Sequence, residues 1–295
     1  MSMDMYKEEQ ARLCSYIEES LANNKQFLIA RFSDIESRFV HHYITKQVTE
    51  MESFQITNNA GINLTSRESV KEYVSSVLNA FRESTMHCTW NEGAMKACMG
   101  ESQDYIQRFS PNTPSVNAIS VDPAIFFAEG VPYENIWVSK LKGKRILIIS
   151  PFVESMKMQL ERGVLSHIYN EPAYFEDCSF TFVKAPLTLA GNHGGVDWRT
   201  RFAELKAAIA SAGEFDIALA GCGGYGMPIC HYIYKELRRS AMYIGGCLQL
   251  FFGIYGERWR NSDSVKKYIE KNPSAWVRPN ERPANLHYVE RGCYW

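Results

Sequence analysis

The chain has 295 residues, of which 45% are hydrophobic and 22% charged, and its formal net charge is −1. This composition is ordinary for a folded globular protein and argues against a disordered chain. The balanced charge gives no indication of a nucleic-acid partner, because binding to a phosphate backbone calls for an excess of basic residues. We therefore expect no nucleic acid among the partners.

Two further global features concern the compartment. No apolar run approaches the roughly 18 residues that span a membrane, and residues 1–13 lack the basic-then-apolar pattern of a signal peptide. The eight cysteines are dispersed without a C-x-x-C pair, which favours reduced core thiols over a zinc site or a disulfide framework. We expect a cytoplasmic protein without a transmembrane segment. The sequence is compatible with a homo-oligomer.

The first half of the chain is predicted to be rich in helices. An apolar residue at every fourth position predicts an amphipathic helix over about 5–21, and the apolar run 27–32 predicts a buried strand. Residues 66–84 predict a further helix with Ser66 as its N-cap. Elsewhere between positions 35 and 137 the pattern is mainly helical and strand signals are weak.

In the second half, short apolar runs alternate with helical segments. The runs that predict strands are 145–150, 179–186, 216–221 and 241–246. The segments with helical periodicity between them are 154–169, 198–213 and 227–240. This alternation implies right-handed βαβ crossovers and a parallel sheet with helices on both faces.

We therefore predict an α/β fold with a Rossmann-like parallel sheet flanked by helices. The whole chain, 1–295, is expected to form one domain. Its helix-rich N-terminal half (about 1–140) would add strand 27–32 to the sheet, the Rossmann-like core would span about 141–260, and 261–295 would form a C-terminal extension.

Ligands of open parallel sheets bind beyond the carboxyl ends of the strands, so the residues that follow each strand are the candidates for a site. The segment GCGGYGMP follows a predicted strand and precedes a helix, where a backbone can approach a phosphate. The candidates in this loop are Gly221, Gly223, Gly224, Tyr225 and Gly226. Its spacing is not the G-x-G-x-x-G dinucleotide fingerprint, and the glycines could equally serve a tight turn.

The next predicted strand ends in a second glycine pair, Gly245 and Gly246. Beyond it, Gln249 could supply an amide, Arg258 a cation and Trp259 a stacking face. The alternative is a buried aromatic segment with a surface arginine.

Two other predicted strands are followed by polar candidates. Ser150 ends the strand 145–150, although a Ser-Pro turn explains it as well. His193 lies beside two glycines in the loop after strand 179–186, where a phosphate-binding or catalytic role competes with a merely solvated histidine.

The strand 27–32 leads into charged residues that allow two interpretations. Ser33 with Glu36 three positions later is a capping-box pattern, which needs no ligand. Asp34 and Glu36 also follow a strand's carboxyl end, where hard carboxylate oxygens suit Mg²⁺ or Mn²⁺ bound to a diphosphate. Residues two apart in a helix point about 200° apart, so both could reach one ion only if Asp34 is not yet helical.

The hexapeptide RFSDIE resembles the R-F-G-D-x-E segment of the GT-D-fold glycosyltransferases, whose D-x-E carboxylates serve the metal ion and the sugar nucleotide. The resemblance implies catalytic roles for Arg31, Asp34 and Glu36, and metal binding by Asp34 and Glu36. Ser33 stands where that family usually has glycine. Segments 216–233, 243–259 and 276–295 look like uncharacterised bacterial and viral relatives of that group found with polysaccharide-assembly proteins.

The resemblance implies a metal-dependent glycosyltransferase that moves a sugar from a nucleoside diphosphate sugar, with a UDP-sugar expected, to a hydroxyl of a glycan acceptor. Mn²⁺ or Mg²⁺ and the glycine-rich loops would stabilise charge on the departing diphosphate. The nucleotide sugar would contact both glycine segments together with Ser150, His193, Gln249 and Arg258.

Two alternatives belong to other functional classes. An S-adenosylmethionine-dependent methyltransferase also holds its cofactor at a glycine-rich turn, but normally after the first strand of the core rather than a late one. The other alternative is a non-catalytic nucleotide-sugar-binding protein of polysaccharide assembly.

Overall fold

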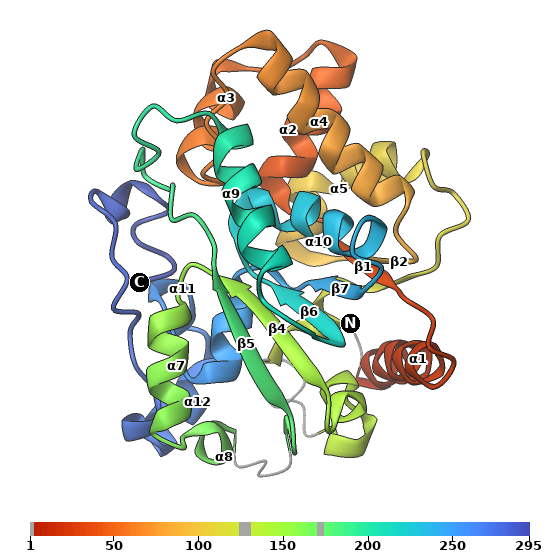
Figure 1. Ribbon diagram of the computed structural model, residues 1–295, viewed down its shortest axis with the longest axis vertical. Coiled ribbons are helices and arrows are strands. Elements are labelled where there is room, and N and C mark those ends of the chain that lie inside the picture. Colours follow the sequence, from red (N-terminus) through yellow and green to blue (C-terminus); the bar gives the residue numbers. More distant parts are fainter. Residues whose placement is uncertain (1–2, 124–130, 170–173) are drawn as a thin grey trace.

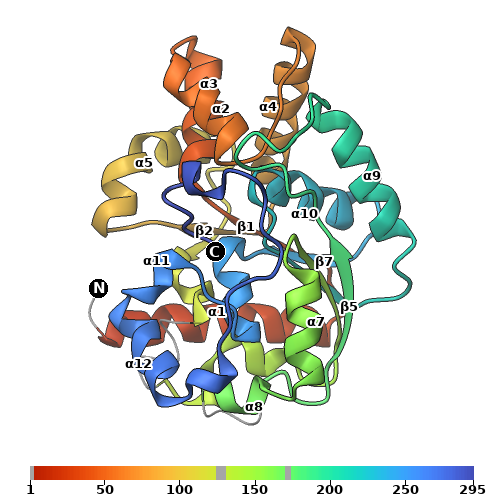
Figure 2. The same cartoon turned by 90° about the vertical axis from the view of Figure 1, so that its left-hand side faces the viewer.

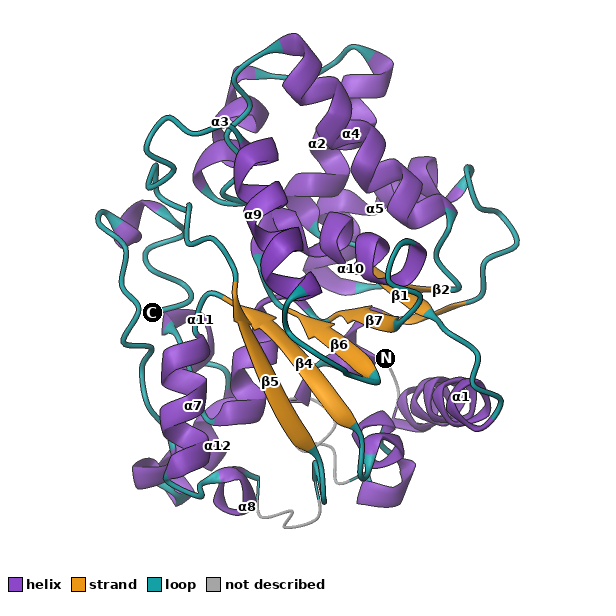
Figure 3. Cartoon of the chain, in the orientation of Figure 1, coloured by secondary structure: helices purple, strands orange, loops and turns teal. Residues whose placement is uncertain are grey.

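The computed structural model describes residues 3–123, 131–169 and 174–295. Within them, seven strands form one parallel sheet in the order β3-β2-β1-β7-β6-β4-β5 (Figures 1 and 3). The strands are β1 (Leu28–Arg31), β2 (Met86–Thr89), β3 (Ser115–Asn117), β4 (Arg145–Ser150), β5 (Ser179–Lys184), β6 (Ile217–Ala220) and β7 (Ser240–Tyr243). The predicted α/β fold with a Rossmann-like parallel sheet is therefore confirmed.

Helices connect and cover these strands. They are α1 (Met3–Ala22), α2 (Asp34–Thr45), α3 (Glu50–Asn58), α4 (Arg67–Arg82), α5 (Gly93–Gln107), α7 (Val153–Glu161), α8 (Leu165–Ile168), α9 (Trp198–Ala210), α10 (Gly226–Lys235), α11 (Glu257–Arg260) and α12 (Asp263–Lys271). A 3₁₀ helix, η5 (Gly245–Phe252), follows β7.

The sheet lies between two helical layers, with α2, α4, α5, α9 and α10 on one face and α1, α7, α8 and α12 on the other (Figure 1). Successive side chains of a strand point to opposite faces, so each strand feeds both cores. In β4, Ile146 and Ile148 pack toward α1 and α7, whereas Leu147 and Ile149 pack toward α9 and α10. Coverage of both faces explains why β1, β4 and β6 are almost continuously apolar.

Strand β1 is an interior strand of the sheet, next to the central strand β7, and strand 27–32 thus joins the same sheet as expected. It pairs with β7 on one side, Leu28 opposite Ala241, and with β2 on the other, Ile29 opposite Met86. Strands β1–β3 build one half of the sheet and β4–β7 the other, so β1 and β7 meet where the two halves join. This junction is the kind of place where open parallel sheets bind ligands.

The structure also corrects several sequence-based predictions. Strands β2 and β3 were not predicted, because they have four and three residues and carry polar side chains that are buried, such as His87 and Asn117. The single helix predicted over 154–169 is two helices, α7 and α8, separated at Gly163, which has a φ of +66°. The predicted strand 241–246 ends at Tyr243, and η5 follows at once.

Two general predictions can be compared with the described residues. All eight cysteines are described and free, and six of them are buried, as expected for reduced core thiols. Among the described helices, none combines the length and the apolar character that a membrane crossing requires.

Candidate functional site

A pocket of about 560 Å³ lies at the carboxyl ends of the strands, around the junction of β1 and β7. Its lining includes Ser33 after β1, Gly245 after β7, Gly221 after β6 and Ser150 at the end of β4. The C-terminal segment 278–295 runs across the same end of the sheet, near α11 (Figure 2). The volume is in the range of small-molecule sites.

Most of the residues predicted from the sequence line this pocket. They are Arg31, Asp34, Glu36, Ser150, Gly221, Gly223, Gly245, Gly246, Gln249 and Arg258. The structure thus brings together side chains from both halves of the chain. The pairing of β1 with β7 places Arg31 and the acidic residues beside the glycines of the second half.

Arg31, the last residue of β1, carries a guanidinium that forms no ion pair with any of the described residues. It lies over the Trp90 ring at 5.0 Å from the ring centroid, and its Nε is buried with no hydrogen-bond partner among the described residues. Gly245 leaves room for it: a Cβ at that position, where φ is +76°, would lie 2.7 Å from Nη1 of Arg31. A partly buried, unpaired cation is a strong attractor for an anionic ligand.

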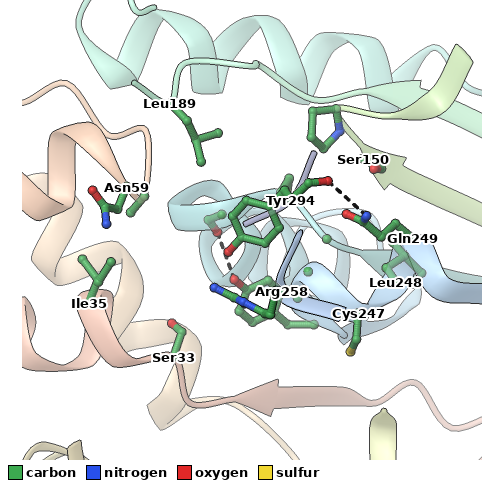
Figure 4. A pocket seen from close by; sticks show the side chains of 18 of the residues that line it. Ser33, Ile35, Asn59, Ser150, Leu189, Cys247, Leu248, Gln249, Arg258 and Tyr294 are labelled. Carbon is green, nitrogen blue, oxygen red and sulfur yellow. Dashed lines mark hydrogen bonds between the residues drawn. The ribbon is translucent and has the colours of Figure 1, made fainter. Parts of the chain in front are cut away.

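Arg258 is the second cation of the pocket, and it is already paired. Its Nη2 donates to Glu290 at 2.6 Å, and its guanidinium lies 4.8 Å from the centroid of the Tyr294 ring (Figure 4). The side chains of Arg258 and Glu290 are both about two-fifths exposed, 41% and 45%. This ion pair lies at the wetter part of the site and attaches the C-terminal segment to α11.

Asp34 is the first residue of α2, so it is helical, and its carboxylate is occupied. Nε of Arg38 donates to Oδ1 at 2.6 Å and Nη2 donates to Oδ2 at 3.3 Å. The thiol of Cys98 donates to Oδ1 at 3.3 Å. Ser33 does occupy the N-cap position, but its side chain makes no capping hydrogen bond, so the capping-box interpretation is wrong.

Glu36 lies on the other side of the first turn of α2 and is 9% exposed. Burial raises the pKa of its carboxyl, while the Ser33 hydroxyl and Arg31 act in the opposite direction. Its charge also raises the pKa of Tyr243 and Tyr294, which line the pocket, although burial is the larger cause for both. Both acidic residues line the pocket, and they differ in that Asp34 is bonded to Arg38 and to Cys98 of α5.

The glycine loop after β6 is only partly a lining of the pocket. Gly221 and Gly223 line it, but Gly224, Tyr225 and Gly226 do not. A Cβ at Gly224 would lie 2.3 Å from Cγ1 of Ile62. Close packing inside the protein accounts for this glycine without any ligand.

Three other predicted site residues, Gly226, Tyr225 and His193, also lie outside the pocket lining. A Cβ at Gly226 would lie 2.1 Å from the Tyr243 ring, and Tyr225 is buried with 1% exposure. His193 lies in the turn 190–195 outside the pocket lining, where its Nδ1 accepts from the backbone N–H of Gly195 at 3.1 Å.

Several lining residues were missed by the sequence analysis. They are Asn59, Trp90, Asp122, Tyr243, Glu290, Tyr294 and Trp295. The rule that strand ends carry ligand contacts could have found Tyr243 at the end of β7, and Trp90 too had β2 been predicted. Tyr294 and Trp295 come from a segment without periodic pattern, which is placed by tertiary bonds: Nε1 of Trp295 donates to the Glu281 carbonyl at 2.7 Å.

The acidic residues fit a divalent ion only in part. No group of three or more His, Cys, Asp or Glu side chains suited to a metal ion occurs among the described residues. Glu36 is a hard oxygen donor in the pocket lining, whereas Asp34 would first have to leave Arg38. Because Mg²⁺ often takes one or two carboxylates together with substrate phosphates, the residues fit an ion that enters with a diphosphate.

Comparisons of the chain with protein-family models, with curated proteins and with solved structures found no match.

Proposed function

We propose that this protein is a glycosyltransferase that binds a nucleoside diphosphate sugar in the pocket at the carboxyl ends of β1, β7, β6 and β4. The observation that carries the proposal is Arg31, a partly buried guanidinium whose Nε has no partner among the described residues. An uncompensated cation in such a place costs stability, and a diphosphate would offset that cost. The resemblance of RFSDIE to the GT-D-fold motif supports the choice of ligand.

The surroundings of Arg31 suit a diphosphate. Gly245 lets the backbone after β7 approach Arg31, and Arg258 adds a second cation at the wetter part of the pocket. In the transfer, the leaving diphosphate gains negative charge, which fixed cations and backbone N–H groups stabilise most in a site that excludes water. Arg31 is the group best placed for this role.

The metal dependence belongs to the same proposal. Glu36 would be the first protein ligand of Mn²⁺ or Mg²⁺, and Asp34 a second ligand once released from Arg38. The ion would neutralise charge on the diphosphate when bound. Arg38 has another carboxylate at hand, because its Nη1 lies 3.6 Å from Oε1 of Glu52. A cytoplasmic location and a glycan acceptor are further parts of the proposal.

A ligand panel tests the proposal against its alternatives. Thermal melting with UDP, with a UDP-sugar plus Mn²⁺, and with S-adenosylmethionine should show stabilisation by the first two only, because a ligand that binds the native state raises the melting temperature. Stabilisation by S-adenosylmethionine alone would favour a methyltransferase. Binding of the UDP-sugar without release of UDP in the presence of glycan acceptors would favour the non-catalytic binding protein.

A further inference from the structure

Gln249, in η5, lines the pocket and carries a buried hydrogen-bond acceptor that is unused. Its side chain is 1% exposed, and its Nε2 donates to the backbone carbonyl of Tyr294 at 3.3 Å (Figure 4). Its Oε1 has no hydrogen-bond partner among the described residues. A carbonyl oxygen cannot donate, so the bond to Tyr294 fixes which amide atom is the nitrogen. The atom left over is therefore an acceptor.

Gln249 belongs to the most buried side of the pocket. Ser150 and Leu248 lie on the same side in Figure 4 and are each 1% exposed, whereas Ile35 and Asn59 on the opposite side are partly exposed. In a sugar transfer the acceptor hydroxyl must reach the anomeric carbon of the donor. The sugar therefore has to lie toward the exposed side, and the buried side takes the part of the ligand that does not react.

That part of a nucleoside diphosphate sugar is the nucleoside, and the side chains suit a planar base. Phe152 and Trp295 meet edge to face with ring centroids 6.0 Å apart, and both line the pocket. Ser150 accepts from the backbone N–H of Phe152 at 3.1 Å, which leaves its O–H to donate. The buried side thus combines aromatic surface with one acceptor, Gln249, and one donor, Ser150.

We propose that Gln249 selects the nucleobase, with its Oε1 accepting a hydrogen bond from a ring N–H of the base. Among the four RNA bases, uracil offers such a group at N3 and guanine at N1, each beside a carbonyl. Adenine and cytosine have no ring N–H on that edge and donate instead from an exocyclic amino group beside a ring nitrogen, so the assignment to a ring N–H separates the two pairs of bases. This inference rests on the proposed function, because it requires a nucleoside diphosphate in the pocket. A buried acceptor discriminates strongly against a ligand that leaves it unpaired.

Equilibrium binding to the full chain tests this assignment. Affinities are measured for UDP, GDP, CDP and ADP, and for 3-methyl-UDP or 1-methyl-GDP, in which a methyl group replaces the ring proton. The preferred nucleotide, UDP or GDP, should bind at least about tenfold more tightly than CDP and ADP. It should also bind at least about tenfold more tightly than its own methylated form. The comparison of UDP with GDP identifies which base is taken, and it needs no variant protein.

A variant then assigns the discrimination to Gln249. Gln249→Met keeps the size of the side chain but removes the amide. In this variant the preference for the unmethylated nucleotide should fall to about threefold or less, because a double-mutant cycle loses the preference when the amide and the ring N–H interact with each other. Gln10→Met is the matched control: Gln10 is also buried with an unpaired Oε1, but it lies outside the pocket lining, so its replacement should leave the affinities unchanged.

The outcomes separate this inference from the proposed function. If UDP or GDP binds and methylation changes the affinity less than about threefold, or if the preference is the same in Gln249→Met, the role of Gln249 is refuted and the function stands. Equal or tighter binding of CDP or ADP also refutes it. If none of the four nucleotides binds, both proposals are refuted.

Discussion

Replacement of Arg31 by methionine separates a ligand-binding role from a structural one. In the free protein the guanidinium has a cation–π contact with Trp90, worth about 0.5–1 kcal/mol, and no ion pair among the described residues. Its burial without a partner opposes that gain. Arg31→Met should therefore shift the melting temperature by no more than a few degrees, since 1 kcal/mol corresponds to about 2–4 °C in domains of roughly 150–250 residues and to less in a longer chain.

The same change should strongly weaken nucleotide binding. Hydrogen bonds to a charged group contribute about 1.5–3 kcal/mol, which corresponds to a roughly ten- to hundredfold loss of affinity for UDP. Isothermal titration calorimetry measures the affinity, and thermal melts measure the stability of the same samples. Arg145→Met is the control, because Arg145 pairs with Asp216 at 2.7 Å and lies outside the pocket lining. Normal UDP affinity in Arg31→Met, with a large loss of stability, would refute the reasoning.

Three further predictions follow from the site. Burial raises the pKa of Glu36, so its ionised form destabilises the fold above that pKa, and this cost disappears in acid. Glu36→Gln should therefore melt at a higher temperature than the wild type at pH 8, with a gain that shrinks toward pH 4.5. An equal gain at both pH values would contradict the assignment. Gly224→Val should lower the melting temperature by several degrees, because overpacking against Ile62 costs about 1–3 kcal/mol of stability. The UDP affinity of the folded protein should stay unchanged. A selective loss of affinity would show that the loop contacts the ligand. Mn²⁺ should bind weakly alone and tighten UDP binding in the wild type but not in Glu36→Gln, as reciprocal linkage requires, whereas a UDP affinity independent of Mn²⁺ would refute the metal.

The fold was largely predictable because its strongest signals are local. Five of the seven described strands are apolar runs bounded by turn residues, and the alternation with helices determines the parallel sheet. Strands β2 and β3 escaped prediction because they are short and contain buried polar residues such as His87, whose Nε2 lies 3.2 Å from the Phe81 carbonyl. That partner is a property of the folded state and leaves no pattern in the sequence.

The site was predictable only where it follows strand ends. Arg31, Ser150 and Gly245 could be found in this way, because the topology of a parallel sheet brings those positions together. The sequence could not reveal that Gly223 lines the pocket whereas Gly224 does not, because this depends on which neighbour, Ala60 or Ile62, packs against each glycine. The contribution of the C-terminal residues was also hidden, because long-range hydrogen bonds place them.

The most direct test of the central claim is a crystal structure of the protein bound to UDP. The diphosphate should lie at the carboxyl ends of β1 and β7, with a phosphate oxygen within hydrogen-bonding distance of Nε of Arg31 and the backbone after Gly245 close by. A diphosphate bound elsewhere, with Nε of Arg31 still unpaired, would contradict it.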